Sequence, residues 1–170
     1  SFPVSAAATA RDGRVQAWDL APLQAALEHG LLPVVYGDVA FDTQRGGTIL
    51  STEDIFDYLL ERLSPRRILL AGIEPGVWED FPARTRLLPA LSAARLEQAE
   101  AGWGASAHVD VTGGMGAKVR QSLAWVQARP DLEVRIFSGD VSDMVRAALL
   151  GEPVGTRIFN RRSTQMDADG

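Results

Sequence analysis

The sequence predicts an α/β protein with a mainly parallel sheet, helices on both faces of that sheet, and a β-hairpin near the N-terminus. Strand-like apolar runs alternate with helical patterns along the chain, and these runs are continuous, as in strands buried on both faces. With 46% apolar residues, the 170-residue chain can form a sizeable core. We expect one domain over residues 1–159, followed by a polar tail over residues 160–170.

The predicted hairpin depends on Asp12-Gly13, a two-residue turn signal between the strand-like segments Val4–Ala10 and Arg14–Trp18. A short helix follows, which Asp19 can cap and which Gly30 ends. These elements form the beginning of the expected fold.

Leu31–Tyr36 is a continuous apolar run, which predicts a strand buried on both faces. Ser51 begins the second helix, with Asp54 three residues later as its capping-box partner, and Pro65 stops that helix. Arg67–Ala71 is predicted to be another buried strand. The beginning of a strand–helix–strand alternation is therefore present in the first half of the chain.

The second half continues this alternation after a long irregular stretch. The predicted elements are, in order, an irregular stretch (Gly72–Pro89), a helix (Leu87–Ala101), a glycine-rich loop (Gly102–Gly116), a helix (Ala117–Ala128), a strand (Leu132–Phe137), a helix (Asp140–Leu150) and a strand (Val154–Phe159).

Composition excludes several function classes. The formal charge of -5, with no dense basic run, argues against nucleic-acid binding. The apolar runs are far shorter than the roughly 20 residues of a membrane helix, and we expect no signal peptide, because the chain opens on neither a basic start nor an apolar block. With no cysteine and two histidines, we expect no disulfide, no thiol catalysis and no metal-ligating residues. We therefore expect a cytoplasmic protein that binds neither nucleic acid nor membrane.

Lys118 is the only lysine among the 17 basic residues, and it follows a glycine-rich stretch. Glycines let backbone N–H groups approach an anion closely, and the N-terminus of the next helix adds partial positive charge. An ammonium in the first turn of that helix can fold back over bound phosphates. The spacing is neither that of a P-loop nor that of a Rossmann fingerprint. The pattern indicates a phosphate-binding cradle, and a flexible loop with a solvated lysine is the alternative.

Two further candidate stretches follow predicted strands, at the sheet edge where ligands bind in open α/β folds. Asp38 and Asp42 could orient a substrate or a magnesium-bound water, or they could simply form a turn. In Gly72–Trp78, the glycines could admit an adenine or a ribose, with Trp78 as an apolar wall; a plain turn is the alternative.

Five short motifs occur in order along the chain. They are Tyr-Gly-Asp-Val-Ala-Phe-Asp (36–42), Arg-Gly-Gly-Thr-Ile-Leu-Ser (45–51), Gly-x3-Gly-Val (72–77), Asp-Val-Thr-Gly-Gly-Met-Gly-Ala-Lys-Val (110–119) and Gly-Glu-Pro-Val-Gly-Thr (151–156). Together they resemble the motifs of the isopentenyl phosphate kinases, a branch of the amino acid kinase superfamily. The resemblance runs from about Val4 to Ile158.

This resemblance implies transfer of the ATP γ-phosphate to isopentenyl phosphate, with ATP and Mg²⁺ as cofactors and a homodimer as a possible assembly. Lys118 would be the catalytic residue. The nucleotide-binding residues would be Ile73, Gly76, Trp78, Gly113, Gly114 and Lys118. The residues near the acceptor substrate would be Gly37, Asp38, Ser51 and Thr52.

The chain departs from the family pattern in three respects. The family's N-terminal lysine, Gly-Ala-Gly loop and histidine do not occur, and we expect the chain to begin at a point that corresponds to the middle of a family member. The turn Gly72–Val77 lacks two aspartates of many relatives, and Ser51–Glu53 stands where relatives often have Ser-Gly-Asp. Catalysis by this chain alone is therefore open. The alternatives are a related kinase for a phosphonate or carboxylate, and a non-catalytic nucleotide-binding module.

Overall fold

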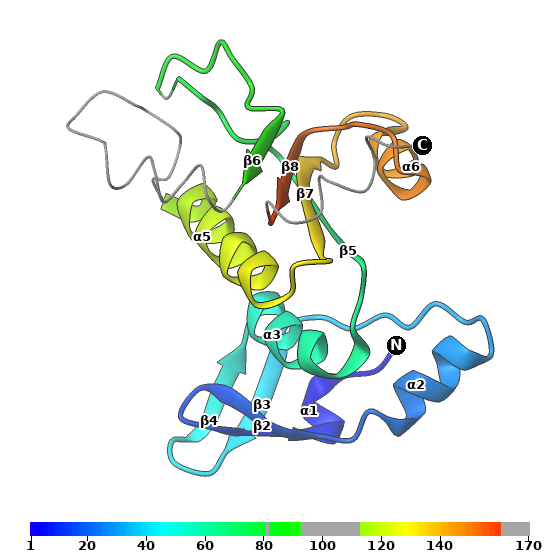
Figure 1. Ribbon diagram of the computed structural model, residues 1–170. Helices are drawn as coiled ribbons and strands as arrows, with labels where there is room; N and C mark the ends of the chain where they lie inside the picture. The colour runs from blue at the N-terminus through cyan, green and yellow to red at the C-terminus, as the bar shows by residue number, and fades with distance from the viewer. Residues whose placement is uncertain (81, 93–112, 161–170) are drawn as a thin grey trace. The chain divides into compact units, whose positions relative to one another are not determined.

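The computed structural model describes residues 1–80, 82–92 and 113–160 (Figure 1). The chain divides into two compact units, Ser1–Ser64 and Pro65–Gly170. Each unit contains a four-stranded sheet with both parallel and antiparallel pairs. The predicted α/β class is confirmed, although the strands belong to two sheets. One domain over residues 1–159 stays a prediction, and residues 161–170 of the predicted tail lie outside the described residues.

The first unit has the strand order β2-β1-β3-β4. Its strands are β1 (Ala8–Arg11), β2 (Arg14–Trp18), β3 (Asp38–Asp42) and β4 (Gly46–Leu50). Its helices are α1 (Val4–Ala7), α2 (Ala21–Glu28) and α3 (Thr52–Leu63). The pairs β1–β2 and β3–β4 are antiparallel, and β1–β3 is parallel. A core of buried apolar side chains joins the helices to one face of this sheet and includes Val4, Ala10, Leu23, Leu50 and Ile55.

The predicted hairpin is confirmed for β1 and β2. Asp12 and Gly13 both have positive φ, 52° and 80°, as a two-residue type I′ turn requires. Val4–Ala7, however, is a helical turn rather than the beginning of the first strand. Pro3, whose φ of -68° suits a helix start, precedes this turn, and the Val4 side chain is fully buried. The hairpin is therefore shorter than predicted.

The predicted buried strand over Leu31–Tyr36 is wrong. The segment has no regular secondary structure, and most of its side chains face solvent, with Leu32 89% exposed, whereas Val35 is partly buried against the core. A strand needs neighbours on its hydrogen-bonding sides, and β1 and β3 pair directly with each other. The Phe2 N–H donates to the Val34 carbonyl at 2.8 Å, which ties the segment to the beginning of the chain without forming a ladder.

The predicted capping box of α3 is confirmed. The Ser51 hydroxyl accepts a hydrogen bond from the Asp54 N–H at 3.1 Å, and the Asp54 carboxylate accepts one from the Ser51 N–H at 2.8 Å. Ser64, with a φ of 47°, ends the helix before Pro65. Local sequence signals thus fix both ends of α3.

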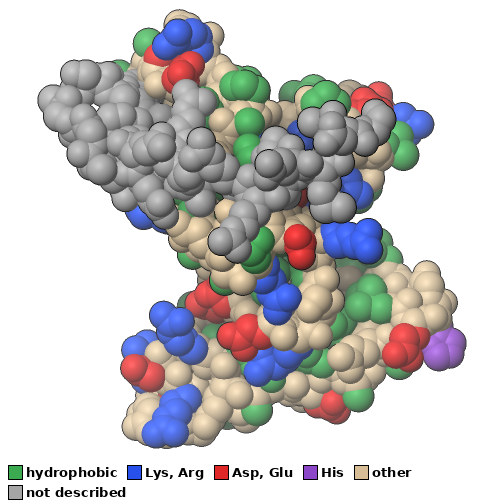
Figure 2. Space-filling model, viewed as in Figure 1, with side chains coloured by type: hydrophobic (Ala, Val, Ile, Leu, Met, Phe, Trp, Pro, Cys, Tyr) green, Lys and Arg blue, Asp and Glu red, His purple; other side chains and the backbone are tan. Residues whose placement is uncertain are grey.

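The face of the first unit in view in Figure 2 carries interspersed basic and acidic side chains. Two ion pairs of this unit are Arg45–Asp12 at 2.6 Å and Arg62–Glu61 at 2.9 Å. Because these side chains are largely exposed, each pair contributes little to stability.

The second unit has the strand order β5-β7-β8-β6. Its strands are β5 (Arg67–Gly72), β6 (Ala90–Ser92), β7 (Glu133–Ser138) and β8 (Thr156–Phe159). Its described helices are α5 (Gly113–Ala128) and α6 (Met144–Leu150). The pairs β5–β7 and β6–β8 are parallel, and β7–β8 is antiparallel. The strands predicted at β5, β7 and β8 are confirmed with small shifts at their ends.

Three other predictions for this unit need correction. The helix predicted over Leu87–Ala101 is wrong at Ala90–Ser92, because pairing with β8 makes these residues a strand; residues 93–101 lie outside the described residues. The predicted glycine-rich loop is wrong over residues 113–116, which form the first turn of α5. The last predicted helix begins only at Met144, because its N-cap, Asp143, has a left-handed φ of 61°.

Ser122 lies in the middle of α5, fully buried, and its hydroxyl has no hydrogen-bond partner among the described residues. A buried hydroxyl without a partner destabilises the folded state, and alanine is a better helix former than serine. Ser122→Ala is therefore expected to raise the free energy of unfolding by about 1 kcal/mol, measured by urea denaturation. Ala124→Ser, on the exposed side of the same helix, should lower it by about 0.5 kcal/mol. A lower unfolding midpoint for Ser122→Ala would contradict this prediction.

Candidate functional site

In the second unit, the structure brings the predicted lysine and the predicted glycine turn together. Gly72 ends β5 and pairs in register with Ser138 at the end of β7. A Cβ atom built on Gly72 would lie 3.9 Å from the Lys118 Nζ atom. The ammonium therefore lies at the C-terminal edge of this sheet, where α/β folds bind ligands.

The beginning of α5, the helix that carries Lys118, adds partial positive charge. The first N–H groups of a helix have no acceptor within it, so those of Gly113 and Gly114 can donate to an anion. Gly114 and Lys118 are four residues apart and share a helix face, and a Cβ on Gly114 would meet no atom within 4 Å. Lys118 lies in the second helical turn instead of the predicted first. This arrangement suits an anion with several charged oxygens.

The turn after β5 presents one exposed and one fixed side chain. Ile73 is 83% exposed, directly after the strand end. The Trp78 indole N–H donates to the Glu74 carboxylate at 3.0 Å, and Arg84 donates to the other oxygen of that carboxylate at 3.1 Å. Trp78 is thus held in place with its polar atom already paired, which is consistent with the predicted apolar wall.

In the first unit, the structure gathers the four residues predicted near an acceptor. A Cβ on Gly37 would lie 3.0 Å from the Leu50 carbonyl oxygen and 3.4 Å from the Thr52 backbone nitrogen. Gly37 therefore passes closely between the end of β4 and the beginning of α3, where Ser51 and Thr52 lie, and Asp38 follows it. A side chain at position 37 would push these segments apart.

Asp38 is held by a residue that the sequence did not indicate. Its carboxylate accepts hydrogen bonds from the Ser5 hydroxyl at 2.5 Å and from the Val39 N–H at 2.8 Å. These bonds, that of the Ser5 hydroxyl above all, hold the pKa of the Asp38 carboxyl below its ordinary value. No local motif marks Ser5, because its partner is 33 residues away in the sequence.

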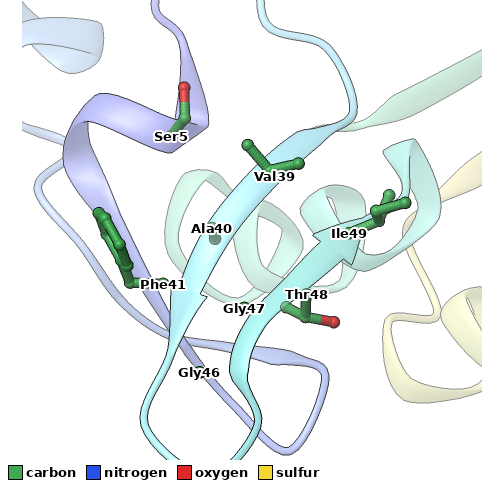
Figure 3. A pocket seen from close by; sticks show the side chains of 8 residues that line it. All are labelled: Ser5, Val39, Ala40, Phe41, Gly46, Gly47, Thr48 and Ile49. Carbon is green, nitrogen blue, oxygen red and sulfur yellow. The ribbon is translucent and has the colours of Figure 1, made fainter.

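The sheet face opposite the core of the first unit carries an apolar groove of about 400 Å³ (Figure 3). Val39 and Ile49 are cross-strand partners on this face, and Phe41 lies opposite Gly47, which leaves room beside the ring. The groove is lined by Ser5, Val39, Ala40, Phe41, Gly46, Gly47, Thr48 and Ile49. Since Ser5 also bonds to Asp38, the groove adjoins the residues predicted near the acceptor. Val39 and Phe41, two positions apart in β3 and therefore on one face of the sheet, were the signal that could have indicated it.

Asp42, the second candidate carboxylate, has a structural role. Its buried carboxylate accepts hydrogen bonds from four backbone N–H groups of the two hairpin turns of this sheet, at distances of 2.7 to 3.1 Å: Asp12, Gly13, Gln44 and Arg45. Burial alone would raise the pKa of Asp42, but these bonds outweigh it and lower the pKa to about 2. The turn-forming alternative therefore describes Asp42 better than a role in substrate binding.

The lowered pKa of Asp42 predicts a stability effect in acid. Because the pKa is lower in the folded state than the ordinary value of 3.8, the stabilisation is fully present above pH 4 and is lost as the pH falls through about 2. Asp42→Asn should lower the melting temperature at pH 7 and flatten its decline between pH 4 and pH 2. Glu28→Gln, which removes one negative charge at an exposed position of the same unit, is the control and should retain the wild-type profile. Unchanged melting of Asp42→Asn at pH 7 would contradict this role.

Two kinds of feature are absent from the described residues, clusters that could hold a metal ion and helices that could span a membrane. No three His, Cys, Asp or Glu side chains gather there in a way that could hold a metal ion. Among those same residues, no helix is long and apolar enough to span a membrane.

Comparison with known proteins places this chain in a family. The model of the amino acid kinase family matches residues 1–138. The chain belongs to the amino acid kinase family. This confirms the superfamily that the five motifs indicated.

Several relatives of this amino acid kinase chain are isopentenyl phosphate kinases. This chain is 35% identical over 167 residues to the isopentenyl phosphate kinase of Methanothermobacter thermautotrophicus, and the match covers 95% of this chain and 61% of the relative. It is 37% identical over 122 residues to that of Haloferax volcanii, covering 72% of this chain and 47% of the relative. A solved isopentenyl phosphate kinase structure superposes with a TM-score of 0.70 at 30% identity, covering 92% of this chain and 57% of that one. The chain thus spans less than two thirds of the length of these relatives.

Proposed function

We propose that this chain belongs to a kinase that transfers the γ-phosphate of ATP to isopentenyl phosphate, giving isopentenyl diphosphate and ADP. The observation that carries the choice of acceptor is the apolar groove beside Asp38 and Gly37. Isopentenyl phosphate has a small branched hydrocarbon chain and an anionic head. An apolar groove favours the hydrocarbon chain. The polar groups of a carboxylate acceptor would find no hydrogen-bond partners along its apolar side chains.

In this proposal, the acceptor phosphate lies near Gly37 and the first turn of α3. The N–H groups at a helix N-terminus attract anions, and Gly37 packs closely against the beginning of this helix. Ser51 and Thr52 belong to the same turn. The hydrocarbon chain would then extend along Val39 and Ile49.

The residues of the second unit fit the phosphates of ATP. Lys118 would neutralise developing negative charge, and the N–H groups of Gly113 and Gly114 would bind phosphate oxygens. Ile73, Gly76 and Trp78 would contact the base or the ribose. Phosphoryl transfer depends on positioning and charge neutralisation more than on covalent chemistry, and these residues supply both.

Magnesium would arrive with the nucleotide. Mg²⁺ in kinases is held largely by substrate phosphates and water, so a cluster of protein ligands is not required for its binding. The described residues offer no such cluster, and we assign no metal ligand to this chain. A homodimer, which the family resemblance implies, is part of the proposal and can be measured by light scattering.

The test is a product assay by mass spectrometry with Mg-ATP and isopentenyl phosphate. It uses the longest natural form of the protein, with the 170-residue chain alongside. Formation of isopentenyl diphosphate by the long form supports the proposal. Turnover of a phosphonate or a carboxylate instead would replace the acceptor, and nucleotide binding without any turnover would favour a binding module.

A further inference from the structure

Thr156 connects two segments that are far from it in the sequence. It begins β8, and its side chain is fully buried. Its hydroxyl donates a hydrogen bond to the Leu88 carbonyl at 2.6 Å and accepts one from the Val77 N–H at 2.8 Å. The hydroxyl therefore both donates and accepts a hydrogen bond within the second unit.

The two bonded segments are the arms of one loop between β5 and β6. The Leu88 N–H donates to the Val77 carbonyl at 2.8 Å, and the Glu79 N–H donates to the Arg86 carbonyl at 2.9 Å. Trp78 forms a β-bridge with Leu87 between these bonds. The arms thus form a short antiparallel ladder, and the Thr156 hydroxyl bonds to both arms at its base.

The turn before this ladder packs directly on Thr156. A Cβ on Gly76 would lie 2.7 Å from the Thr156 Oγ1 atom and 3.2 Å from its backbone nitrogen. The same turn begins at Gly72, beside the Lys118 ammonium, and contains the exposed Ile73. The position of the turn relative to the sheet edge therefore depends on the contact between Gly76 and Thr156.

We propose that Thr156 is a positioning residue for nucleotide binding: its buried hydroxyl fixes the Gly72–Trp78 turn at the sheet edge beside Lys118. Thr156 has no exposed surface and acts through Gly76 and Val77 rather than by contact with the ligand. This inference rests on the proposed function, because that function makes the turn a nucleotide-binding element.

The test compares Thr156→Val with Thr156→Ser in the longest natural form of the protein. Valine keeps the branched shape but has no hydroxyl, whereas serine keeps the hydroxyl. Hydrogen exchange of the Val77 amide reports whether the turn is held, independently of activity. Calorimetric binding of Mg-ADP reports nucleotide affinity without requiring an acceptor. Thr85→Val is the control, because Thr85 bonds to Asp80 at the exposed end of the same loop.

For Thr156→Val we expect faster exchange at Val77, about tenfold weaker Mg-ADP binding and a raised KM for ATP, with the KM for the acceptor unchanged. Thr156→Ser and Thr85→Val should match the wild type in exchange and binding.

In Thr156→Val, faster exchange at Val77 with unchanged Mg-ADP affinity would overturn the proposal, as would unchanged exchange at Val77. If Thr156→Val does not fold, Thr156→Ser carries the test. Weaker Mg-ADP binding in Thr156→Ser, with Val77 exchange as slow as in the wild type, would also overturn the proposal. A wild-type protein that binds no Mg-ADP would instead overturn the proposed function, and the exchange data would still show whether Thr156 holds the turn.

Discussion

Replacing Lys118 with alanine is expected to weaken nucleotide binding by roughly 10- to 100-fold. The change removes a charge-assisted hydrogen bond to phosphate, which contributes about 1.5–3 kcal/mol. No other lysine occurs in the chain, so no flexible ammonium is available to replace it. The Lys118 Nζ atom already lies near Gly72 at the sheet edge, so the loss should fall on the phosphates and not on folding.

Calorimetric titration with Mg-ADP and the KM for ATP would measure this effect. Lys118→Arg keeps the charge but replaces a compact ammonium with a broad planar group, and we expect it to restore binding only in part. Arg66→Ala removes one positive charge before β5, at the opposite end of that strand from Gly72, and should leave affinity unchanged. Equal losses in Lys118→Ala and Arg66→Ala would mean that net charge, and not contact, determines affinity.

The elements predicted correctly are those with local signals. The turn Asp12-Gly13 requires two positive φ angles, and the capping box of Ser51 and Asp54 satisfies the beginning of a helix within four residues. Gly151, with a φ of 88°, ends α6 as expected. In each case the residues that determine the geometry are neighbours in the sequence.

The elements predicted wrongly depend on partners far away in the sequence. Leu31–Tyr36 has the composition of a buried strand, but composition does not supply the neighbouring strand that it needs. Ala90–Ser92 lies in a helical pattern and becomes a strand because β8 pairs with it. Tertiary pairing therefore outweighed local preference at both positions.

The candidate site shows the same division. Motif recognition indicated Gly37, Asp38 and Lys118, and the structure places Gly37 against the first turn of α3 and Lys118 beside Gly72. Ser5 was missed, because its bond to Asp38 spans 33 positions. The sequence left the role of Asp42 open, because its carboxylate binds N–H groups of two turns that are about 30 residues apart in the sequence.

Gly155→Ala is expected to destabilise the second unit by about 3–5 kcal/mol, the largest stability effect among the changes considered. A Cβ at this position would lie 2.1 Å from the Ile136 carbonyl oxygen and 2.7 Å from the Phe137 Cβ atom. Neither atom is the end of a flexible side chain, so β7 or β8 would have to move. The left-handed φ of 60° adds about 1–2 kcal/mol for any residue other than glycine.

Gly151→Ala separates these two contributions. Gly151 also has a left-handed φ, 88°, in the same unit, but a Cβ there would meet only the Arg67 side chain at an ordinary 3.5 Å. Urea denaturation should therefore give a loss of about 1 kcal/mol for Gly151→Ala, from backbone strain alone. Because Gly155 directly precedes Thr156, movement of β8 in Gly155→Ala should also speed exchange at the Val77 amide, whereas Gly151→Ala should not. Equal destabilisation by the two substitutions would show that strain, and not the close packing of Gly155 on β7, determines the conformation at this position.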